Sequence, residues 1–378
     1  MKKIKNLLMI IVFSAIILSM AVASVLSADK EVSYSERRKL AQFSSLGETS
    51  ILSSEFSKEV EKYLLDQMPL REGLRMLDSK IRLNLLFQSD VNGLWTYKDH
   101  MFKNDEPLNE KQVAYGINLM NKLIKTNLKD ANVYYSVVPE KTYFVRDKFK
   151  HLKFDYNKLE NLLKNGVAGA RYIDIKDTLE LSDYYYTDTH WSQDKLFETV
   201  NKIAKEMGTD KYITPETEYK KQLLEPFYGV YWAQAAIGEK PDKLCYLTSD
   251  YTENAKVYGI DPEVLKNKFG VTDTLEKKVY ATDKFGKMES YDIFLSGAQP
   301  LVTIESENAK TDKELIIFRD SFSSSIAPLF TGAYKKVTLI DLRYMPSMLL
   351  NEFVEFKAGQ DVLFLYSASL YNSSMLLK

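Results

Sequence analysis

The side chains best suited to chemistry are an aspartate and a histidine two residues apart. Asp188 and His190 lie in residues 184–192, YYYTDTHWS, immediately before a segment with apolar residues at helical spacing. In an extended segment, side chains two positions apart point to the same side, so the carboxylate can orient one ring nitrogen and make the imidazole more basic. A structural histidine is the alternative role for so short a motif. Ser192 is expected to cap the helix that follows.

A serine-rich turn provides a second candidate for chemistry. Residues 315–325, LIIFRDSFSSS, have the pattern of a buried strand that ends in a charged pair and a run of serines. At the carboxyl end of a parallel strand, a serine and the N–H groups of a helix start can form a nucleophile and part of an oxyanion hole together. This geometry suits acyl transfer. Alternatively, Ser321 to Ser325 only cap a helix.

Composition limits the other kinds of chemistry. The 378 residues include 51 basic and 52 acidic side chains, which provides no strong basic field for nucleic acid. The one cysteine, Cys245, leaves no cluster for zinc, and no second histidine accompanies His190 at ligand spacing. We therefore expect no nucleic-acid partner, no metal and no other cofactor.

The elements that must position these residues follow the pattern of an α/β sheet. Runs of β-branched and aromatic residues alternate with segments of helical period, and the runs are apolar on both faces, as in parallel strands covered by helices on two sides. The predicted strands are residues 132–138, 171–175, 315–318, 337–341 and 362–366, and residues 111–125 are predicted to form a helix. Ligands of such sheets sit beyond the carboxyl ends of the strands.

The N-terminal segment indicates export. Lys2, Lys3 and Lys5 precede an uncharged apolar run from Leu7 to Ala28, which is long enough to span a bilayer. The basic flank places everything after Ala28 outside the cytoplasm. Because residues 21–23 are Ala-Val-Ala, a cleaved signal peptide and an uncleaved membrane anchor both fit. We predict a signal peptide or anchor in residues 1–28, a helical linker in 29–90 and one domain in 91–378, with an insertion around 208–297.

Several separated motifs together resemble the DHHW family of bacterial surface proteins, which is similar to the alginate O-acetyltransferases and to SGNH hydrolases. The matching segments follow the family's order: 66–71 (DQMPLR), 91–93 (VNG), 138–141 (VPEK), 185–191 (YYTDTHW), 291–297 (YDIFLSG), 320–322 (DSF) and 341–344 (DLRY). This resemblance covers most of the exported part of the chain.

The resemblance implies an SGNH-hydrolase-like fold of the three-layer, flavodoxin-like type. It also implies that Ser321 is the nucleophile, His190 the general base and Asp188 its orienting partner. The implied activity is transfer of acetyl groups to sugar hydroxyls of an exported polysaccharide, at the cell surface or in secreted form. The acetyl donor would be delivered by a membrane-bound O-acyltransferase.

The chain departs from the family pattern at two places. Thr189 stands where the family has the first of two histidines, and Ala298 stands where it usually has an asparagine that can donate to the oxyanion. Loss of one oxyanion donor costs about 10²- to 10³-fold in rate. Gln299 or another group substitutes for it, or the protein is slow or inactive. We expect the backbone N–H groups of Ser321 and Gly297 to hold the oxyanion.

Other side chains are candidates for substrate contacts. Arg343 and Lys141 match family positions near strand ends, although a structural ion pair is the alternative role for each. Tyr186, with neighbouring tyrosines and the aromatic residues 228, 231 and 232, can provide platforms for sugar rings. The same residues would serve an acetylesterase with water as acceptor. A catalytically weak scaffold that binds polysaccharide or an acyltransferase partner is the third possibility.

Overall fold

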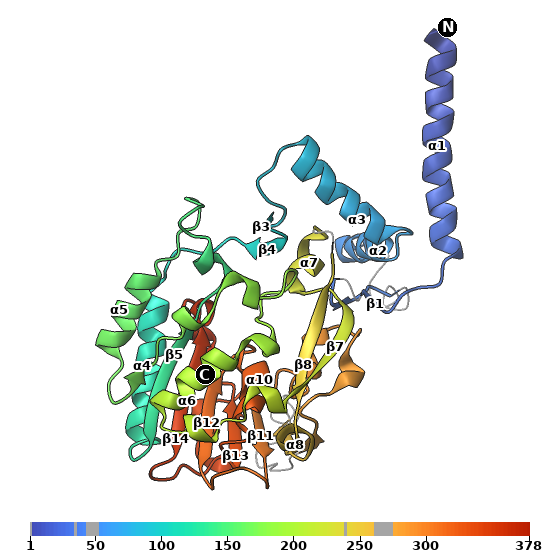
Figure 1. The fold of residues 1–378 in the computed structure, drawn as a ribbon. Helices are drawn as coiled ribbons and strands as arrows, with labels where there is room; N and C mark the ends of the chain where they lie inside the picture. Colours follow the sequence, from blue (N-terminus) through green and yellow to red (C-terminus); the bar gives the residue numbers. More distant parts are fainter. Residues whose placement is uncertain (1, 34–35, 43–52, 238–239, 261–274) are drawn as a thin grey trace.

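A computed structural model describes residues 2–33, 36–42, 53–237, 240–260 and 275–378 of the chain (Figure 1). Two parts of the predicted linker, 34–35 and 43–52, lie outside the described residues. Parts of the predicted insertion, 238–239 and 261–274, do so as well.

The centre of the domain is an eight-stranded sheet with the order β10-β9-β11-β13-β12-β14-β5-β6. Its parallel part consists of β13 (Lys336–Ile340), β12 (Glu314–Arg319), β14 (Asp361–Ser367), β5 (Asn132–Val138) and β6 (Arg171–Tyr172). Three antiparallel strands extend it: β11 (Leu301–Glu305), β9 (Lys256–Ile260) and β10 (Leu275–Lys277). The sheet is therefore mostly, but not wholly, parallel.

Alternation along each central strand builds two cores, one on each face of the sheet. In β12, Leu315 and Ile317 belong to one apolar cluster, whereas Ile316 and Phe318 belong to the other. This explains the uninterrupted apolar runs in the sequence, because a strand covered on both sides has no polar face. The domain is thus three-layered.

Helices cover both faces, as the sequence predicts (Figure 1). One face is covered by α4 (Glu110–Thr126), α5 (Tyr156–Gly166) and α12 (Ala368–Tyr371), and the opposite face by α6 (Phe197–Glu206) and α10 (Ser323–Ile326). The predicted α4 is confirmed to within a residue at each end, and Asn109 caps it by accepting a hydrogen bond from the Gln112 N–H. The short helix α11 (Leu350–Phe353) precedes β14.

The helix after His190 begins later than predicted. Ser192 precedes a single 3-10 turn (Gln193–Lys195), and its hydroxyl donates to Asp194 Oδ1 at 2.6 Å instead of capping α6. The α-helix proper begins at Phe197 after Leu196. The serine-rich turn after β12 does lead into a helix, α10, which tightens to a 3-10 helix at residues Ala327–Phe330, where Pro328 lies.

Four of the five predicted strands match the observed strands to within one residue at each end. The exception is β6, which pairs over only two residues before the chain leaves the sheet. Sequence patterns did not indicate β9, β10 or β11. Two of them, β9 and β10, lie in the predicted insertion, which therefore contributes strands to the sheet.

Two hairpins stand beside the sheet. One pairs β3 (Leu94–Tyr97) with β4 (His100–Lys103) through a two-residue loop, Lys98 and Asp99, both with positive φ. The other pairs β7 (Lys220–Phe227) with β8 (Asp242–Thr248). The helix α7 (Val230–Ala235) lies in the connection between these two strands, and α8 (Asp250–Glu253) follows β8.

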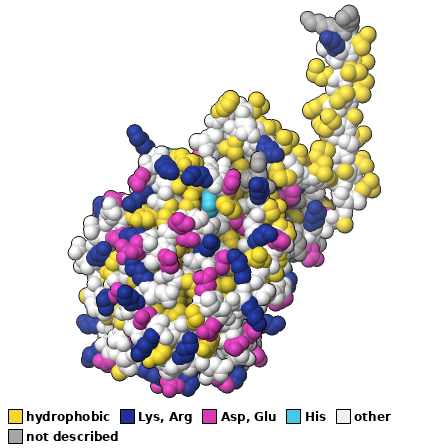
Figure 2. All heavy atoms as spheres, viewed as in Figure 1, with side chains coloured by type: hydrophobic (Ala, Val, Ile, Leu, Met, Phe, Trp, Pro, Cys, Tyr) yellow, Lys and Arg dark blue, Asp and Glu magenta, His cyan; other side chains and the backbone are white. Residues whose placement is uncertain are grey.

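The N-terminal part of the chain contains a long apolar helix and a small helical layer. Helix α1 (Lys2–Leu26) is long and apolar enough over residues Ile4–Ser24 to cross a membrane, by length and composition, and projects from the domain (Figure 2). Strands β1 (Val32–Ser33) and β2 (Arg38–Lys39) pair with each other. Helices α2 (Ser54–Asp66) and α3 (Arg71–Lys80) follow, and a π-helical turn (Ile81–Leu85) continues α3.

Candidate active site

The structure brings Ser321, His190 and Asp188 together at the carboxyl end of β12. His190 Nε2 lies 2.7 Å from Ser321 Oγ, and His190 Nδ1 lies 2.6 Å from Asp188 Oδ1. Asp188 is completely buried, whereas Ser321 is partly exposed. The imidazole can therefore donate its Nδ1 proton to the carboxylate and accept the serine proton at Nε2.

The surroundings of Asp188 keep its carboxylate charged. Oδ1 also accepts the backbone N–H of His190 at 3.0 Å, and Oδ2 accepts the N–H of Val230 at 2.7 Å. The guanidinium of Arg37 lies 3.6 Å from Oδ2. Burial alone would raise the pKa of Asp188, but His190 and Arg37 outweigh it and hold the pKa below its usual range.

An aromatic ring fixes the plane of the imidazole. Tyr291 stacks on His190 with ring centroids 3.9 Å apart and an angle of 8° between the planes. Its hydroxyl donates to Ser325 Oγ at 2.8 Å, and the indole of Trp191 donates to the same oxygen at 2.9 Å. Tyr291 and Trp191 are therefore linked through the Ser325 hydroxyl, and this link holds the ring that stacks on His190 in place.

Neither predicted helper of the oxyanion, Gly297 or Gln299, is placed to donate. The Gly297 N–H donates to the carbonyl of Phe294 at 3.0 Å, and the Gln299 side chain donates to the carbonyl of Leu295 at 3.2 Å. Both donors are used inside a tight turn, in which Leu295, Ser296 and Gly297 all have positive φ. Gly297 is required there, since a Cβ would collide with the carboxylate of Asp292.

One backbone donor, the N–H of Ser321, remains free beside the Ser321 hydroxyl, because nothing among the described residues accepts it. Ala298 is exposed, and the residues on both sides of it are tied to the end of β12, because Arg319 donates to the carbonyls of Gly297 at 3.2 Å and Gln299 at 3.3 Å. A side chain longer than alanine at position 298 therefore has space.

Lys141 lines the cavity described below and also bonds to the loop that carries Asp188 and His190. It is buried, and its ammonium donates to the carbonyls of Tyr185 at 2.8 Å and of Tyr186 and Asp188 at 3.0 Å. Burial lowers the pKa of Lys141 to about 7. Its position is that of a clamp under the loop that carries Asp188 and His190.

The other two predicted contacts are on the surface. Arg343 Nε and Nη2 donate to the two carboxylate oxygens of Asp341 at 2.9 and 2.6 Å. This is the structural ion pair expected from the sequence as the alternative role. Tyr186 is half exposed, and its ring lies 4.5 Å from that of His100.

Three neighbours of the candidate triad were not predicted. Asp242 of β8 accepts the backbone N–H groups of Tyr186 and Thr187, both at 2.7 Å, and so holds the loop that carries Asp188 and His190 from the other side. Tyr291 lies in a family motif that indicated a match but no role. Arg37 reaches Asp188 from the segment after α1, a contact that no local pattern indicates.

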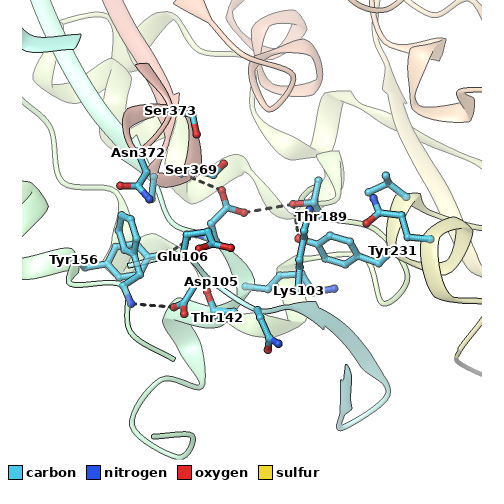
Figure 3. A pocket seen from close by; sticks show the side chains of 17 residues that line it. Lys103, Asp105, Glu106, Thr142, Tyr156, Thr189, Tyr231, Ser369, Asn372 and Ser373 are labelled. Carbon is cyan, nitrogen blue, oxygen red and sulfur yellow. Dashed lines mark hydrogen bonds between the residues drawn. The ribbon is translucent and has the colours of Figure 1, made fainter. Parts of the chain in front are cut away.

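A cavity of about 410 Å³ opens next to the triad loop (Figure 3). Thr189, which precedes His190, lines it together with Tyr231, and the Tyr231 hydroxyl donates to Thr189 Oγ1 at 3.0 Å. Glu140 lines the same cavity and accepts long hydrogen bonds of 3.4 Å from Thr189 and from the N–H of Ser369. Burial raises the pKa of Glu140. No lysine or arginine of the described chain lies within 4.0 Å of this carboxylate.

The cavity contains the groups that sugars bind. Its walls combine aromatic rings, hydroxyls, amides and carboxylates, among them Phe154, Tyr156, Tyr231, Thr142, Ser369, Asn104, Asn372 and Glu140. Aromatic faces and convergent polar groups are typical of small-molecule sites. In the described part of the chain, no three His, Cys, Asp or Glu side chains are grouped so as to hold a metal ion.

Comparison with known proteins gives matches among solved structures. No protein-family model matches the chain, and no curated protein does. A DHHW family protein from Eubacterium siraeum has a TM-score of 0.57 at 20% identity, covering 75% of this chain and 93% of its own. Bacillus cereus PatB1, solved with a sulfonyl adduct, has a TM-score of 0.60 at 20% identity, and the match covers 76% of this chain and 99% of the PatB1 chain. The O-acetyltransferase domain of Pseudomonas putida AlgJ has a TM-score of 0.42 at 11% identity, covering 74% and 92%.

The likenesses to the DHHW family protein and to PatB1 agree with the three-layer sheet described above. They also agree with the fold that the order of the motifs along the chain predicts. The chain therefore has the SGNH-hydrolase-like fold of the DHHW family protein and of PatB1.

Proposed function

We propose that this protein is an extracytoplasmic O-acetyltransferase that acts on hydroxyl groups of an exported polysaccharide. The observation that carries the proposal is the series Asp188, His190 and Ser321, joined by contacts of 2.6 and 2.7 Å. The sugar-compatible cavity beside this series supports a carbohydrate acceptor. Helix α1 supports a location at the outer face of a membrane, or secretion if it is cleaved.

In the first half of the reaction, Ser321 becomes acetylated. His190 Nε2 accepts the hydroxyl proton while Ser321 Oγ attacks the carbonyl carbon of a donor acetyl ester. The negative charge that develops on the carbonyl oxygen is stabilised by the N–H of Ser321. The bond to the donor oxygen then breaks, and His190 gives that oxygen the proton.

In the second half, the acetyl group passes to the sugar. His190 accepts the proton of a sugar hydroxyl as its oxygen attacks the acetyl carbon, and the proton returns to Ser321 Oγ when the ester bond breaks. Asp188 remains ionised throughout and stabilises the imidazolium form of His190. Transfer requires that a bound sugar occupies the position that water would otherwise take. The donor is an acetyl ester that a membrane-bound O-acyltransferase would supply.

A second candidate function is a catalytically weak polysaccharide-binding scaffold. The observation that favours it is the missing oxyanion donor: Ala298 has no donor in its side chain, and Gly297 and Gln299 bond elsewhere. The cavity would then bind sugar without turnover.

Hydrolysis of p-nitrophenyl acetate by the full-length chain in detergent separates these functions. Ser321→Ala and His190→Ala should each lower the rate by at least about 10³-fold. Ser323→Ala is the matched control, since Ser323 is a buried serine of the same turn whose hydroxyl donates to the Leu365 carbonyl at 3.4 Å. It should keep the wild-type rate. PatB1 was solved with a sulfonyl adduct, so a sulfonyl fluoride is a suitable second probe, and it should modify Ser321 only while His190 is present.

Oligosaccharide acceptors decide between the functions. Acetylated sugar detected by mass spectrometry in wild type, and lost in Ser321→Ala, supports transfer. Acetate release that acceptors leave unchanged indicates an acetylesterase. Equal rates for wild type and both triad variants contradict catalysis and leave the scaffold.

A further inference from the structure

The helical layer next to α1 exposes an unusual amount of apolar surface. Along α2, α3, the π-helical turn and the residues that flank them, exposed side chains include Leu70, Leu77 and Phe87, which are 82%, 52% and 85% exposed. We call this surface the outer apolar face; its further members are Leu64, Leu65, Met76, Ile81, Leu85 and Leu86. In Figure 2, hydrophobic side chains gather where α3 projects from the domain. Contiguous apolar surface of this kind marks an interaction site.

The orientation of α3 is the reverse of a helix that packs on a core. Its one buried residue is Ser79, whose hydroxyl donates to the carbonyl of Ala235, and Arg75 donates to the carbonyl of Ala233 at 2.5 Å. In an ordinary surface helix, apolar residues face the core and polar residues face water. Here polar residues bind the domain, while Met76 and Leu77 point outward.

The same reversal holds at the end of α2. Asp66 is buried and bonded to Arg38, and the Ala41 N–H donates to it at 2.9 Å, whereas the preceding Leu64 and Leu65 are exposed. The outer apolar face is therefore the exposed side of a helical layer whose opposite side makes polar contacts with the domain. The occupant of this face must be apolar.

Hydrogen bonds place this face next to the end of α1. Asp29 lies three residues after the end of α1, and its Oδ1 accepts a hydrogen bond from the Tyr63 hydroxyl at 2.9 Å. Lys30 and Gln67 exchange two bonds, from the Lys30 N–H to Gln67 Oε1 at 2.9 Å and from Gln67 Nε2 to the Lys30 carbonyl at 3.0 Å. Leu64 and Leu65 lie between Tyr63 and Gln67 on the same helix, so they lie where the apolar helix meets the domain.

The apolar run of α1 has the length of a bilayer core. Its 21 residues, Ile4–Ser24, extend over about 31 Å at 1.5 Å per residue, and the hydrocarbon core measures about 30 Å. Residues 54–85 carry six basic and six acidic side chains, so attraction to anionic lipids is not what this face offers. Its binding energy would come from burial of apolar side chains.

We propose that the outer apolar face rests in the surface layer of the same lipid bilayer that α1 spans. The inference uses one part of the proposed function, the membrane location, and is independent of the acetyl-transfer chemistry. It places the domain on the membrane as a fixed body instead of leaving it on a free tether.

Quenching by spin-labelled lipid tests the proposal in the full-length chain. The chain is reconstituted into nanodiscs of zwitterionic phosphatidylcholine that contain doxyl-labelled lipid, and a bimane fluorophore is attached to one introduced cysteine at a time. The native Cys245 is buried, so it should not react. Leu77→Cys and Phe87→Cys test the face. Ile16→Cys on α1 is the positive control, and Asp312→Cys, whose side chain is 92% exposed in the loop before β12, is the negative control.

The expected result is strong quenching at positions 16, 77 and 87 and none at 312, with no change in 0.5 M salt. Quenching at 16 but not at 77 and 87 overturns the proposal and leaves α1 as a tether. No quenching at 16 contradicts the membrane location in the proposed function, whatever the other positions show. Disulfide cross-linking between Leu77→Cys chains without lipid quenching would assign the face to a second copy instead.

Discussion

Asp188→Asn separates the charge of the triad from its shape. The carboxylate accepts three N–H groups: Oδ1 those of the His190 ring and backbone, at 2.6 and 3.0 Å, and Oδ2 that of Val230, at 2.7 Å. An asparagine of the same size offers one acceptor oxygen and one NH₂ donor. One side of the site must therefore place a donor against a donor.

The less costly solution inactivates the histidine. If the amide oxygen stays on the Val230 N–H, the NH₂ group faces His190 Nδ1 and moves the ring proton to Nε2. Nε2 then cannot accept the proton of Ser321. Loss of the correct tautomer lowers kcat by about 10⁴-fold, or about 5 kcal/mol at 1.36 kcal/mol per factor of ten.

Asp242→Asn is the matched control. Asp242 is also a buried carboxylate that holds the catalytic loop, through the N–H groups of Tyr186 and Thr187 and the Thr187 hydroxyl, but it bonds to neither His190 nor Ser321. It should lower Tm while kcat for p-nitrophenyl acetate stays within about 10-fold of wild type. A kcat for Asp188→Asn within 10-fold of wild type would refute the tautomer argument. Equal losses in both variants would show that loop position, not charge, controls the rate.

The loss of stability caused by Asp188→Asn, relative to wild type, should also depend on pH. Because the pKa of Asp188 is lower in the folded chain than its ordinary 3.8, the charged carboxylate stabilises the fold above that pH and ceases to do so as pH falls through the folded pKa. The Tm difference between wild type and variant should be large at pH 7 and smaller near pH 3. A difference that does not change with pH would contradict the assignment of a stabilising charge.

Three further substitutions test the surroundings of the triad. Lys141→Met leaves three carbonyls without their donor and should lower the unfolding free energy by about 3 kcal/mol, measurable by chemical denaturation. Folding lowers the pKa of Lys141 from 10.5 to about 7, so the unfolded wild type binds more protons than the folded chain between these pH values. The unfolding free energy of wild type should therefore rise from pH 7 to 10.5, and that of the variant should not show this rise. Glu140→Gln should raise Tm at pH 7, since folding raises the pKa of this carboxyl, and should raise KM for sugar acceptors by about 10-fold if they bind there. Ala298→Asn restores an oxyanion donor and should raise kcat by up to about 10²-fold.

Local patterns predicted the elements whose signals are local. The strands β5, β12, β13 and β14 are mostly apolar on both faces between polar or charged residues at their ends, so their ends are visible in the sequence to within a residue. Strand β11, LVTIE, is as apolar as these but was not predicted, because it pairs antiparallel with β9 and β13, far from it in the chain. The α/β alternation gives no signal for strands added at an edge in this way.

The triad was predictable for a related reason, and its oxyanion side was not. Asp188 and His190 lie two positions apart, and this spacing alone suggested the pair. The backbone between them is not the extended segment expected from the sequence but a bent loop closed by the Tyr184–Trp191 bridge, in which the His190 N–H donates to Asp188 Oδ1. The directions of the N–H groups at Gly297 and Gln299 depend on three consecutive positive φ angles, at Leu295, Ser296 and Gly297. Non-glycine residues adopt such angles only where tertiary packing forces them, so no sequence pattern predicts them.

The burial of Asp188 shows why the site needs the whole fold. An isolated carboxylate without exposed surface costs several kcal/mol in solvation, and only partners that arrive together compensate for this cost. Those partners come from separate parts of the chain: Arg37 after α1, Val230 at the start of α7, and His190 itself. Lys141, from the turn after β5, donates to the Asp188 carbonyl from below the same loop. The buried charge of Asp188 is therefore stable only once the segment after α1, the β7–β8 connection and the central sheet have all assembled, so the geometry of the proposed triad depends on the N-terminal segment.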